Sequence, residues 1–216
     1  ADRYGVPRLA FVNKLDREGA SFEKVVEEIG TRLGATPVPI QIPCGEGPAH
    51  VDHSFRGIID LVRMRQLSFD AQDQGATISE EAISDDYLDT AQLWRDSMLE
   101  KLYAHSDEMM ELALAEEEIP EALIQRVLRQ ATIQMQIQPL LCGSALHGIG
   151  VQPLLDAVQD YLPCPLDMPP VAGVGRGKKG GRETPQERAP SPTEPFCGLV
   201  FKVQADTHGD LCFLRI

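Results

Sequence analysis

The sequence predicts an α/β fold with a parallel sheet and flanking helices, interrupted by an inserted α+β segment. Two βα units carry this prediction, one at residues 8–33 and one at residues 139–162. Each begins with a continuous apolar run, which is typical of a strand buried on both faces of a parallel sheet. Between them the pattern changes to short alternating runs and then to acidic helices. The α/β pattern therefore resumes after an insertion.

The first unit has a strand at residues 8–12, preceded by Pro7, and a polar loop at residues 13–19. Gly34 stands where the following helix should stop. The apolar residues that recur at helical spacing in between are Phe22, Val25, Val26, Ile29 and Leu33. Open α/β sheets bind ligands at the carboxyl ends of their strands, so the loop is a candidate site.

The inserted segment should hold a small sheet followed by three helices. The runs PVPIQIP, FRGIIDLV and MRQLSF favour short strands. The first helix carries an apolar stripe from Tyr87 to Leu102, Ser106 caps a second helix that runs through Glu118, and Pro120 opens the third. Core packing is the expected role of these apolar stripes.

The second unit has a strand at residues 139–142, a loop at residues 143–150 and a helix at residues 151–162. A Pro, Gly and basic stretch follows, which has little to bury and reads as a flexible linker. The runs at residues 196–203 and 211–216 favour two strands of a further all-β domain.

Charge is concentrated in the insertion. The 216 residues carry a formal net charge of -13, and the stretch from Asp70 to Glu121 alone holds 16 acidic and two basic residues. Such a surface repels a phosphate backbone, which argues against sequence-specific DNA binding and favours a basic protein partner. A merely solvated helical face is the alternative explanation.

Several further patterns bound the class of protein. The five cysteines are odd in number and never form a CxxC pair, which argues against a zinc site or a disulfide framework and favours a reducing, cytoplasmic setting. No apolar run is long enough to span a bilayer, and the start lacks signal-peptide features. The chain begins at Ala1 and stops at Ile216 within an apolar run, so we expect a piece of a longer protein.

The loop after the first strand reads Asn13-Lys14-Leu15-Asp16. Guanine presents acceptors at O6 and N7 and donors at N1 and N2, so a carboxylate can accept both donors while an amide serves the acceptors. A lysine stem can lie over the ring face. Adenine would mismatch the carboxylate, but Asn and Asp also make ordinary turns and helix caps.

The loop Gly143-Ser144-Ala145 also follows a buried strand, so the two loops can meet over neighbouring strands. There the backbone N–H of Ala145 could donate to guanine O6 while Ser144 steadies the loop and Asp16. A plain Gly-Ser turn before a helix is the alternative for this triplet alone. Together, the two loops make a stronger prediction of a guanine site than either does alone.

The run YGVPRLAFVNKLDREGASF resembles the fourth nucleotide-binding motif of bacterial translation elongation factor G, and CGSALHGIGVQPLLDAVQDYLPCPLDMP resembles the region of its fifth motif. The likeness covers nearly the whole chain. It implies a partial P-loop-type GTPase domain that binds GTP or GDP through Asn13, Lys14, Asp16, Ser144, Ala145 and Leu146. It also implies a ribosomal partner and a parent that promotes translocation of tRNA and mRNA.

The resemblance divides the chain into five parts. Residues 1–35 are part of the G domain with the guanine motif, and residues 36–135 are an inserted subdomain, called G prime, that faces the ribosomal stalk protein. Residues 136–165 end the G domain, residues 166–194 are the linker, and residues 195–216 start a β-barrel, domain II.

The chain contains no GxxxxGK[ST] loop and no switch segment with its Mg²⁺-binding threonine. We therefore assign no catalytic or metal-binding residue, place the Mg²⁺ ligands outside this chain, and expect no GTP hydrolysis by the chain alone. The five histidines receive no catalytic role, and a solvated loop is the expected setting of His50 and His53.

Other functions remain open. The segment ADTHGDLCFLRI is about a residue shorter than the pattern of translocation factors, which leaves room for a paralogue specialised for ribosome recycling. The chain could also act only as a protein-interaction module through its acidic insert. An ATP-using α/β enzyme is disfavoured, because Asp16 would face the N1 acceptor of adenine.

Overall fold

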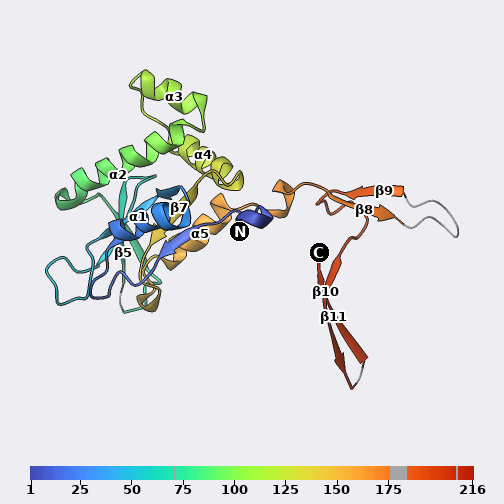
Figure 1. Ribbon diagram of the computed structural model, residues 1–216. Helices are drawn as coiled ribbons and strands as arrows, with labels where there is room; N and C mark the ends of the chain where they lie inside the picture. Colours follow the sequence, from blue (N-terminus) through green and yellow to red (C-terminus); the bar gives the residue numbers. More distant parts are fainter. Residues whose placement is uncertain (71, 176–183, 208) are drawn as a thin grey trace. The chain divides into compact units, whose positions relative to one another are not determined.

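The computed structural model describes residues 1–70, 72–175, 184–207 and 209–216. These residues form two compact units, Ala1–Leu162 and Pro163–Ile216 (Figure 1). The larger unit contains the two predicted base-binding loops. Among the described residues, no helix is both long and apolar enough to cross a membrane.

A three-stranded parallel sheet organises the larger unit, in the order β1-β7-β2. The strands are β1 (Ala10–Val12), β7 (Gln138–Cys142) and β2 (Pro37–Pro39), and both outer strands run parallel to β7. The helices α1 (Phe22–Leu33) and α5 (Val151–Tyr161) follow β1 and β7. The predicted α/β fold with a parallel sheet and flanking helices is confirmed.

Strand β2 gives the sheet a member that the sequence had placed in the insertion. All three of its residues are buried, and its register sets Pro39 opposite Leu140. The side chain of Gln138 accepts the Thr36 N–H at 2.7 Å, while the Gln138 N–H donates to the Thr36 carbonyl at 2.9 Å. The parallel sheet thus extends past residue 36, because this short run finds its hydrogen-bond partners about a hundred residues away.

The insertion contains an antiparallel sheet in the order β3-β4-β5-β6. Its strands are β3 (Gln41–Cys44), β4 (Gly57–Asp60), β5 (Arg65–Phe69) and β6 (Ile78–Glu81). Strand β6 was not predicted, because its sequence ISEE is polar and mostly exposed at the sheet edge. Such an edge strand lacks the apolar alternation by which strands are found in sequences.

Three helices follow, as predicted: α2 (Asp85–Tyr103), α3 (Asp107–Leu114) and α4 (Glu121–Ile133) (Figure 1). Helix α3 stops four residues earlier than Glu118, and Glu116 adopts a left-handed φ of 56° that an α-helix cannot contain. Pro120 is the residue before α4 rather than its first helical position. Buried side chains from the parallel sheet, the antiparallel sheet and the helices form one apolar core.

Asp60 organises the turn between β4 and β5. Its Oδ1 accepts the backbone N–H groups of Val62 at 2.8 Å and Arg63 at 3.0 Å. Burial raises the pKa of Asp60 above its ordinary value, although these two hydrogen bonds and the charge of Arg63 act to lower it. The carboxyl group is therefore held in place by the backbone that surrounds it.

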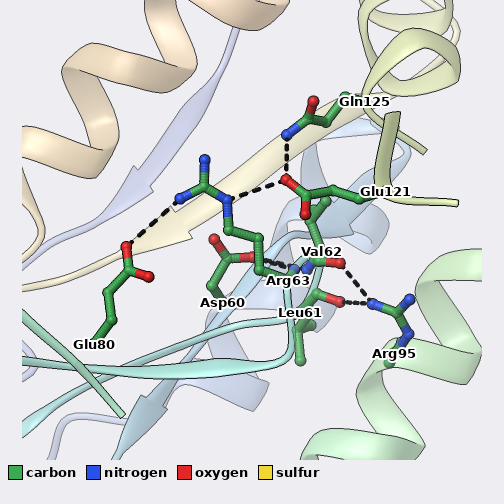
Figure 2. Close-up of polar contacts among 8 residues, drawn as sticks. All are labelled: Asp60, Leu61, Val62, Arg63, Glu80, Arg95, Glu121 and Gln125. Carbon is green, nitrogen blue, oxygen red and sulfur yellow. Dashed lines mark hydrogen bonds and ion pairs between the residues drawn. The ribbon is translucent and has the colours of Figure 1, made fainter. Parts of the chain in front are cut away.

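Arginines tie this turn to its neighbours (Figure 2). The Arg63 guanidinium lies 3.2 Å from Glu121 on α4 and 3.6 Å from Glu80 on β6. Arg95 on α2 donates to the carbonyls of Leu61 and Val62. The turn between β4 and β5 is thus bonded to the edge strand and to two helices.

The smaller unit contains two pairs of antiparallel strands. Strands β8 (Val171–Gly175) and β9 (Thr184–Arg188) pair with each other, as do β10 (Leu199–Asp206) and β11 (Gly209–Arg215). The first pair lies within the stretch expected to be a flexible linker, although residues 176–183 of that stretch are outside the described residues. No closed barrel forms among the strands that the structure describes.

Candidate guanine-binding site

The two candidate loops leave neighbouring parallel strands at the same edge of the sheet. Val12 at the end of β1 lies opposite Cys142 at the end of β7. The Gly143 N–H donates to the Val12 carbonyl at 3.0 Å, and the Leu15 N–H donates to the Gly143 carbonyl at 3.3 Å. The backbone therefore holds the loops together before any side chain takes part.

Asn13 bridges the two loops with one oxygen atom. Its Oδ1 accepts the N–H of Lys14 at 2.8 Å and the N–H of Ala145, 132 positions away in the chain, at 2.9 Å. The Ala145 N–H was expected to face guanine O6, but here it donates to Asn13. This bond orients the Asn13 amide, whose nitrogen is the chemical donor that the guanine acceptors need.

Lys14 has a backbone φ of 66°, in the left-handed region that few non-glycine residues adopt. Such strain persists where the surroundings enforce it, and it is concentrated at functional sites. Here Leu15 enforces it, since its side chain is only 1% exposed and its carbonyl accepts the Gly47 N–H at 2.7 Å. The buried Leu15 thus leaves its neighbours Lys14 and Asp16 in the loop above the sheet.

Asp16 is a carboxylate with a histidine and an arginine beside it. Its Oδ2 lies 3.4 Å from His147 Nε2 and 3.9 Å from Arg17 Nε. Burial acts to raise the pKa of Asp16, but contact with Ser144, a backbone hydrogen bond and the charges of His147 and Arg17 outweigh it, so the pKa falls below its usual value. Asp16 is therefore ionised at neutral pH, as an acceptor of two guanine donors must be.

Ser144 is completely buried beneath the second loop. Its hydroxyl lowers the pKa of Asp16, yet among the described residues it makes no hydrogen bond of full geometry. The Ser144 hydroxyl thus lies close to Asp16 without a well-aligned hydrogen bond to it. That Ser144 steadies Asp16 stays a prediction.

Leu146 completes the second loop, which forms a short 3-10 helix at Ala145–His147. Its side chain is 74% exposed and borders a pocket of about 420 Å³ beside Asp16. The pocket is lined by Asp16, Arg17, Glu18, Pro48, His50, Leu146 and His147. Five of the six predicted site residues thus lie where the two loops meet. The sixth, Leu146, lines the same pocket as Asp16.

The insertion supports both loops from outside. Glu46 accepts the Phe22 N–H at 2.6 Å, which ties the loop after β3 to the start of α1. The turn between β5 and β6 packs on the second loop, where Gln152 donates to the Gly75 carbonyl at 2.5 Å. Gly148 allows this approach, because a Cβ there would lie 1.7 Å from the Gln74 carbonyl oxygen.

The family of the chain follows from its likeness to known protein families. Residues 1–164 match the family described as the elongation factor Tu GTP binding domain, which is well over half of the 216 residues. The chain belongs to this family of GTP-binding domains. Its members are translation-factor GTPases, so guanine nucleotide is the ligand that the family implies for the domain.

A solved structure shares the fold of this GTP-binding domain. The crystal structure of a protein from Thermus thermophilus matches all of the chain with a TM-score of 0.71 and 23% sequence identity. The chain spans 28% of that protein. The likeness therefore concerns the fold, and it leaves the activity of the whole protein to be proposed.

The family usually pairs its nucleotide with Mg²⁺, but the residues of this GTP-binding domain do not fit the metal. In the described ranges, no group of three or more His, Cys, Asp or Glu side chains is placed to hold a metal ion. The phosphate-binding GxxxxGK[ST] sequence is also absent from the chain.

Sequence reasoning missed some residues that line the pocket of this GTP-binding domain. Pro48 and His50 come from the insertion, and nothing in their local sequence indicates contact with a loop that lies over thirty residues earlier. His147 was within reach of prediction, because it stands two residues after Ala145 and an imidazole is a natural partner for a carboxylate.

Proposed function

We propose that this chain is the base-recognising part of an elongation factor G-type GTPase and that its two loops bind the guanine of GTP or GDP. The carboxylate of Asp16 accepts N1–H and N2–H, the amide of Asn13 donates to guanine acceptors, and the Lys14 stem covers the ring face. Ser144, Ala145 and Leu146 form the opposite side. The observation that supports this proposal best is the 2.9 Å bond from Ala145 N–H to Asn13 Oδ1, which joins the two motifs.

Base discrimination follows from the chemistry of Asp16. Adenine places an acceptor where guanine has its N1 donor, so it leaves the ionised carboxylate unpaired. A site built on such hydrogen bonds rejects the wrong partner by about 10⁴-fold. The low pKa of Asp16 supports this function, since a protonated carboxyl group would lose one of its two acceptor positions.

The first test is Asp16→Asn in the longer protein that carries this chain together with a phosphate-binding loop. An amide supplies a donor for the extra carbonyl of xanthine, so preference should move from GDP to XDP by about 10²-fold or more. Competition binding with the two nucleotides measures it. Asp89→Asn, on the exposed face of α2, is the matched control. An Asp16→Asn protein that still prefers GDP as the native protein does would remove Asp16 from the base site.

For the parent protein we propose translocation of tRNA and mRNA on the ribosome, coupled to GTP hydrolysis. Ribosome recycling is the second candidate, favoured by the shortened segment ADTHGDLCFLRI, of which His208 lies outside the described residues. Parallel assays of the full-length protein separate them. A protein that splits post-termination ribosomes but does not advance mRNA is a recycling factor.

We also propose that the acidic insertion binds a basic surface of the ribosomal stalk protein. Glu116, Glu117 and Glu118 are exposed in the loop between α3 and α4, whereas Glu121 is paired with Arg63. The first three are therefore the residues chosen for a test, since changing them leaves the pair of Glu121 with Arg63 intact. Their attraction is screened beyond about 8 Å at physiological salt, so it acts mainly on the association rate.

The partner surface is tested by replacing Glu116, Glu117 and Glu118 together with Lys. Association with the stalk protein should slow about tenfold at low salt and approach the native rate at high salt. The control replaces Glu23, Glu27 and Glu28 of α1 with Lys, which reverses the same number of charges elsewhere. Equal association rates for all three proteins would show that the loop only solubilises the domain.

A further inference from the structure

The His147 imidazole lies beside the Asp16 carboxylate, which is the proposed acceptor of the guanine donors. Its Nε2 lies 3.4 Å from Asp16 Oδ2, and the side chain of Asp16 is only 17% exposed while that of His147 is 57% exposed. Asp16 is thus reached mainly from the pocket side, where His147 and Leu146 form part of the lining. A base that bonds both carboxylate oxygens has to displace the imidazole.

We propose that His147 competes with guanine for the Asp16 carboxylate, so that base binding weakens when His147 carries a proton. The inference rests on the proposed guanine site and adds a residue that sets its affinity. A protonated imidazole donates an N–H and attracts the carboxylate by charge. A neutral imidazole loses the charge and holds Asp16 more weakly.

The other charged groups around His147 cannot produce the same dependence. Arg17, at 3.9 Å from Asp16, stays charged over the whole accessible pH range. Glu18 lines the pocket, but a carboxylate only accepts hydrogen bonds and cannot hold Asp16. His50, from the loop after β3, also lines the pocket, but of these two histidines it is His147 that pairs with Asp16.

The charge of Asp16 does not change over the pH range in which imidazoles titrate. Charges and contacts around it hold its pKa below the ordinary value, so the acceptor is ionised both above and below the pH at which imidazoles titrate. Only the competitor changes. Ion pairs of this exposure shift an equilibrium by about two- to fivefold, which sets the expected size of the effect.

The experiment uses the 216-residue chain with guanosine as the probe, because a nucleoside has no phosphate that would itself titrate near neutral pH. Guanosine affinity is measured by NMR titration at about pH 5.5 and about pH 8, on either side of ordinary imidazole titration. His147→Gln is the test variant and His50→Gln is the matched control, since both histidines line the same pocket. Adenosine controls for stacking without base recognition.

We expect the native chain and His50→Gln to bind guanosine about two- to fivefold more tightly at the higher pH, and His147→Gln to bind equally at both. Linkage is reciprocal, so saturating guanosine should also lower the pH at the midpoint of the His147 imidazole titration. A merely structural histidine would not show that second effect.

The possible failures are distinguishable. Guanosine binding that is independent of pH in the native chain, or an unchanged dependence in His147→Gln, overturns the competition and leaves the guanine site standing. Tighter binding at the lower pH also overturns it. Absence of any preference for guanosine over adenosine at either pH overturns the guanine site and the competition together.

Discussion

Asp16 and Asp60 are both carboxylates that sit beside an arginine near the end of a core strand, but their surroundings shift their pKa values in opposite directions. Burial acts to raise both pKa values. At Asp16 the contact with Ser144 and the charges of His147 and Arg17 overcome burial, whereas at Asp60 the backbone hydrogen bonds and Arg63 do not. Glu121 adds a negative charge that raises the pKa of Asp60 further.

The difference indicates that Asp16 is placed to bind a ligand, whereas Asp60 stabilises the turn between β4 and β5. Asp60 has its oxygen occupied by the N–H groups of Val62 and Arg63, within the bonded turn of Figure 2. Asp16 lies in a pocket and faces the side chains of His147 and Arg17, both more than half exposed. An exposed side chain can move aside for a ligand at little cost, while a backbone N–H cannot.

The largest expected effect concerns the support under the Asp16 site. Gly148→Ala puts a Cβ within 1.7 Å of the Gln74 carbonyl at a residue with φ of 72°, so backbone strain adds to overpacking. We expect a loss of about 3 kcal/mol in the free energy of unfolding, measured by urea denaturation.

Gly19→Ala is the control for that change. Gly19 has a similar φ of 75°, but a Cβ there would meet nothing within 4 Å. Its cost should be the backbone term alone, about 1 kcal/mol. Equal losses in the two variants would mean that the turn between β5 and β6 does not brace the second loop.

The next largest effect tests the different roles of Asp16 and Asp60 directly. Asp60→Ala leaves the N–H groups of Val62 and Arg63 without their acceptor and should cost about 2 kcal/mol. Asp60→Asn keeps an acceptor oxygen and should cost less. Asp16→Ala should change stability by no more than about 0.5 kcal/mol, because its ion-pair partners are exposed side chains and the buried Ser144 hydroxyl makes no full hydrogen bond to it. Thermal unfolding that ranks Asp16→Ala as the more damaging change contradicts the division of roles.

The same division explains what the sequence could predict. The apolar residues at helical spacing and the stop at Gly34 predict helix Phe22–Leu33, because these signals are local. The two loops were placed at the sheet edge because both follow continuous apolar strands. Strand β6 and the pairing of β2 with β7 could not be found, since they depend on partners distant in the chain. The contact between His147 and Asp16 is equally non-local, which is why the competitor emerged only from the structure.

The smallest expected effect is on the pH dependence of the free energy of unfolding. Asp16 and Asp60 should contribute to it with opposite signs. Both carboxyls have an ordinary pKa of 3.8. The pKa of Asp16 is lowered in the folded state, so its contribution is present above pH 3.8 and is lost as the pH falls through the folded-state value. The pKa of Asp60 is raised, so the folded state holds its proton longer and stability falls as the pH rises from 3.8 through the folded-state value.

The two amide variants should therefore flatten opposite sides of the stability profile. Asp16→Asn should reduce the loss of stability that occurs as the pH falls below 3.8. Asp60→Asn should reduce the loss of stability that occurs as the pH rises above 3.8. Each change should be less than about 1 kcal/mol. Urea unfolding of the native chain and both variants between about pH 2.5 and about pH 6 measures this, with Asp89→Asn as the exposed control. If both variants flatten the same side, the surroundings of Asp16 and Asp60 do not differ in the way their contacts indicate. In that case the readiness of Asp16 to accept guanine would have to come from the mobility of the loop rather than from its ionised state.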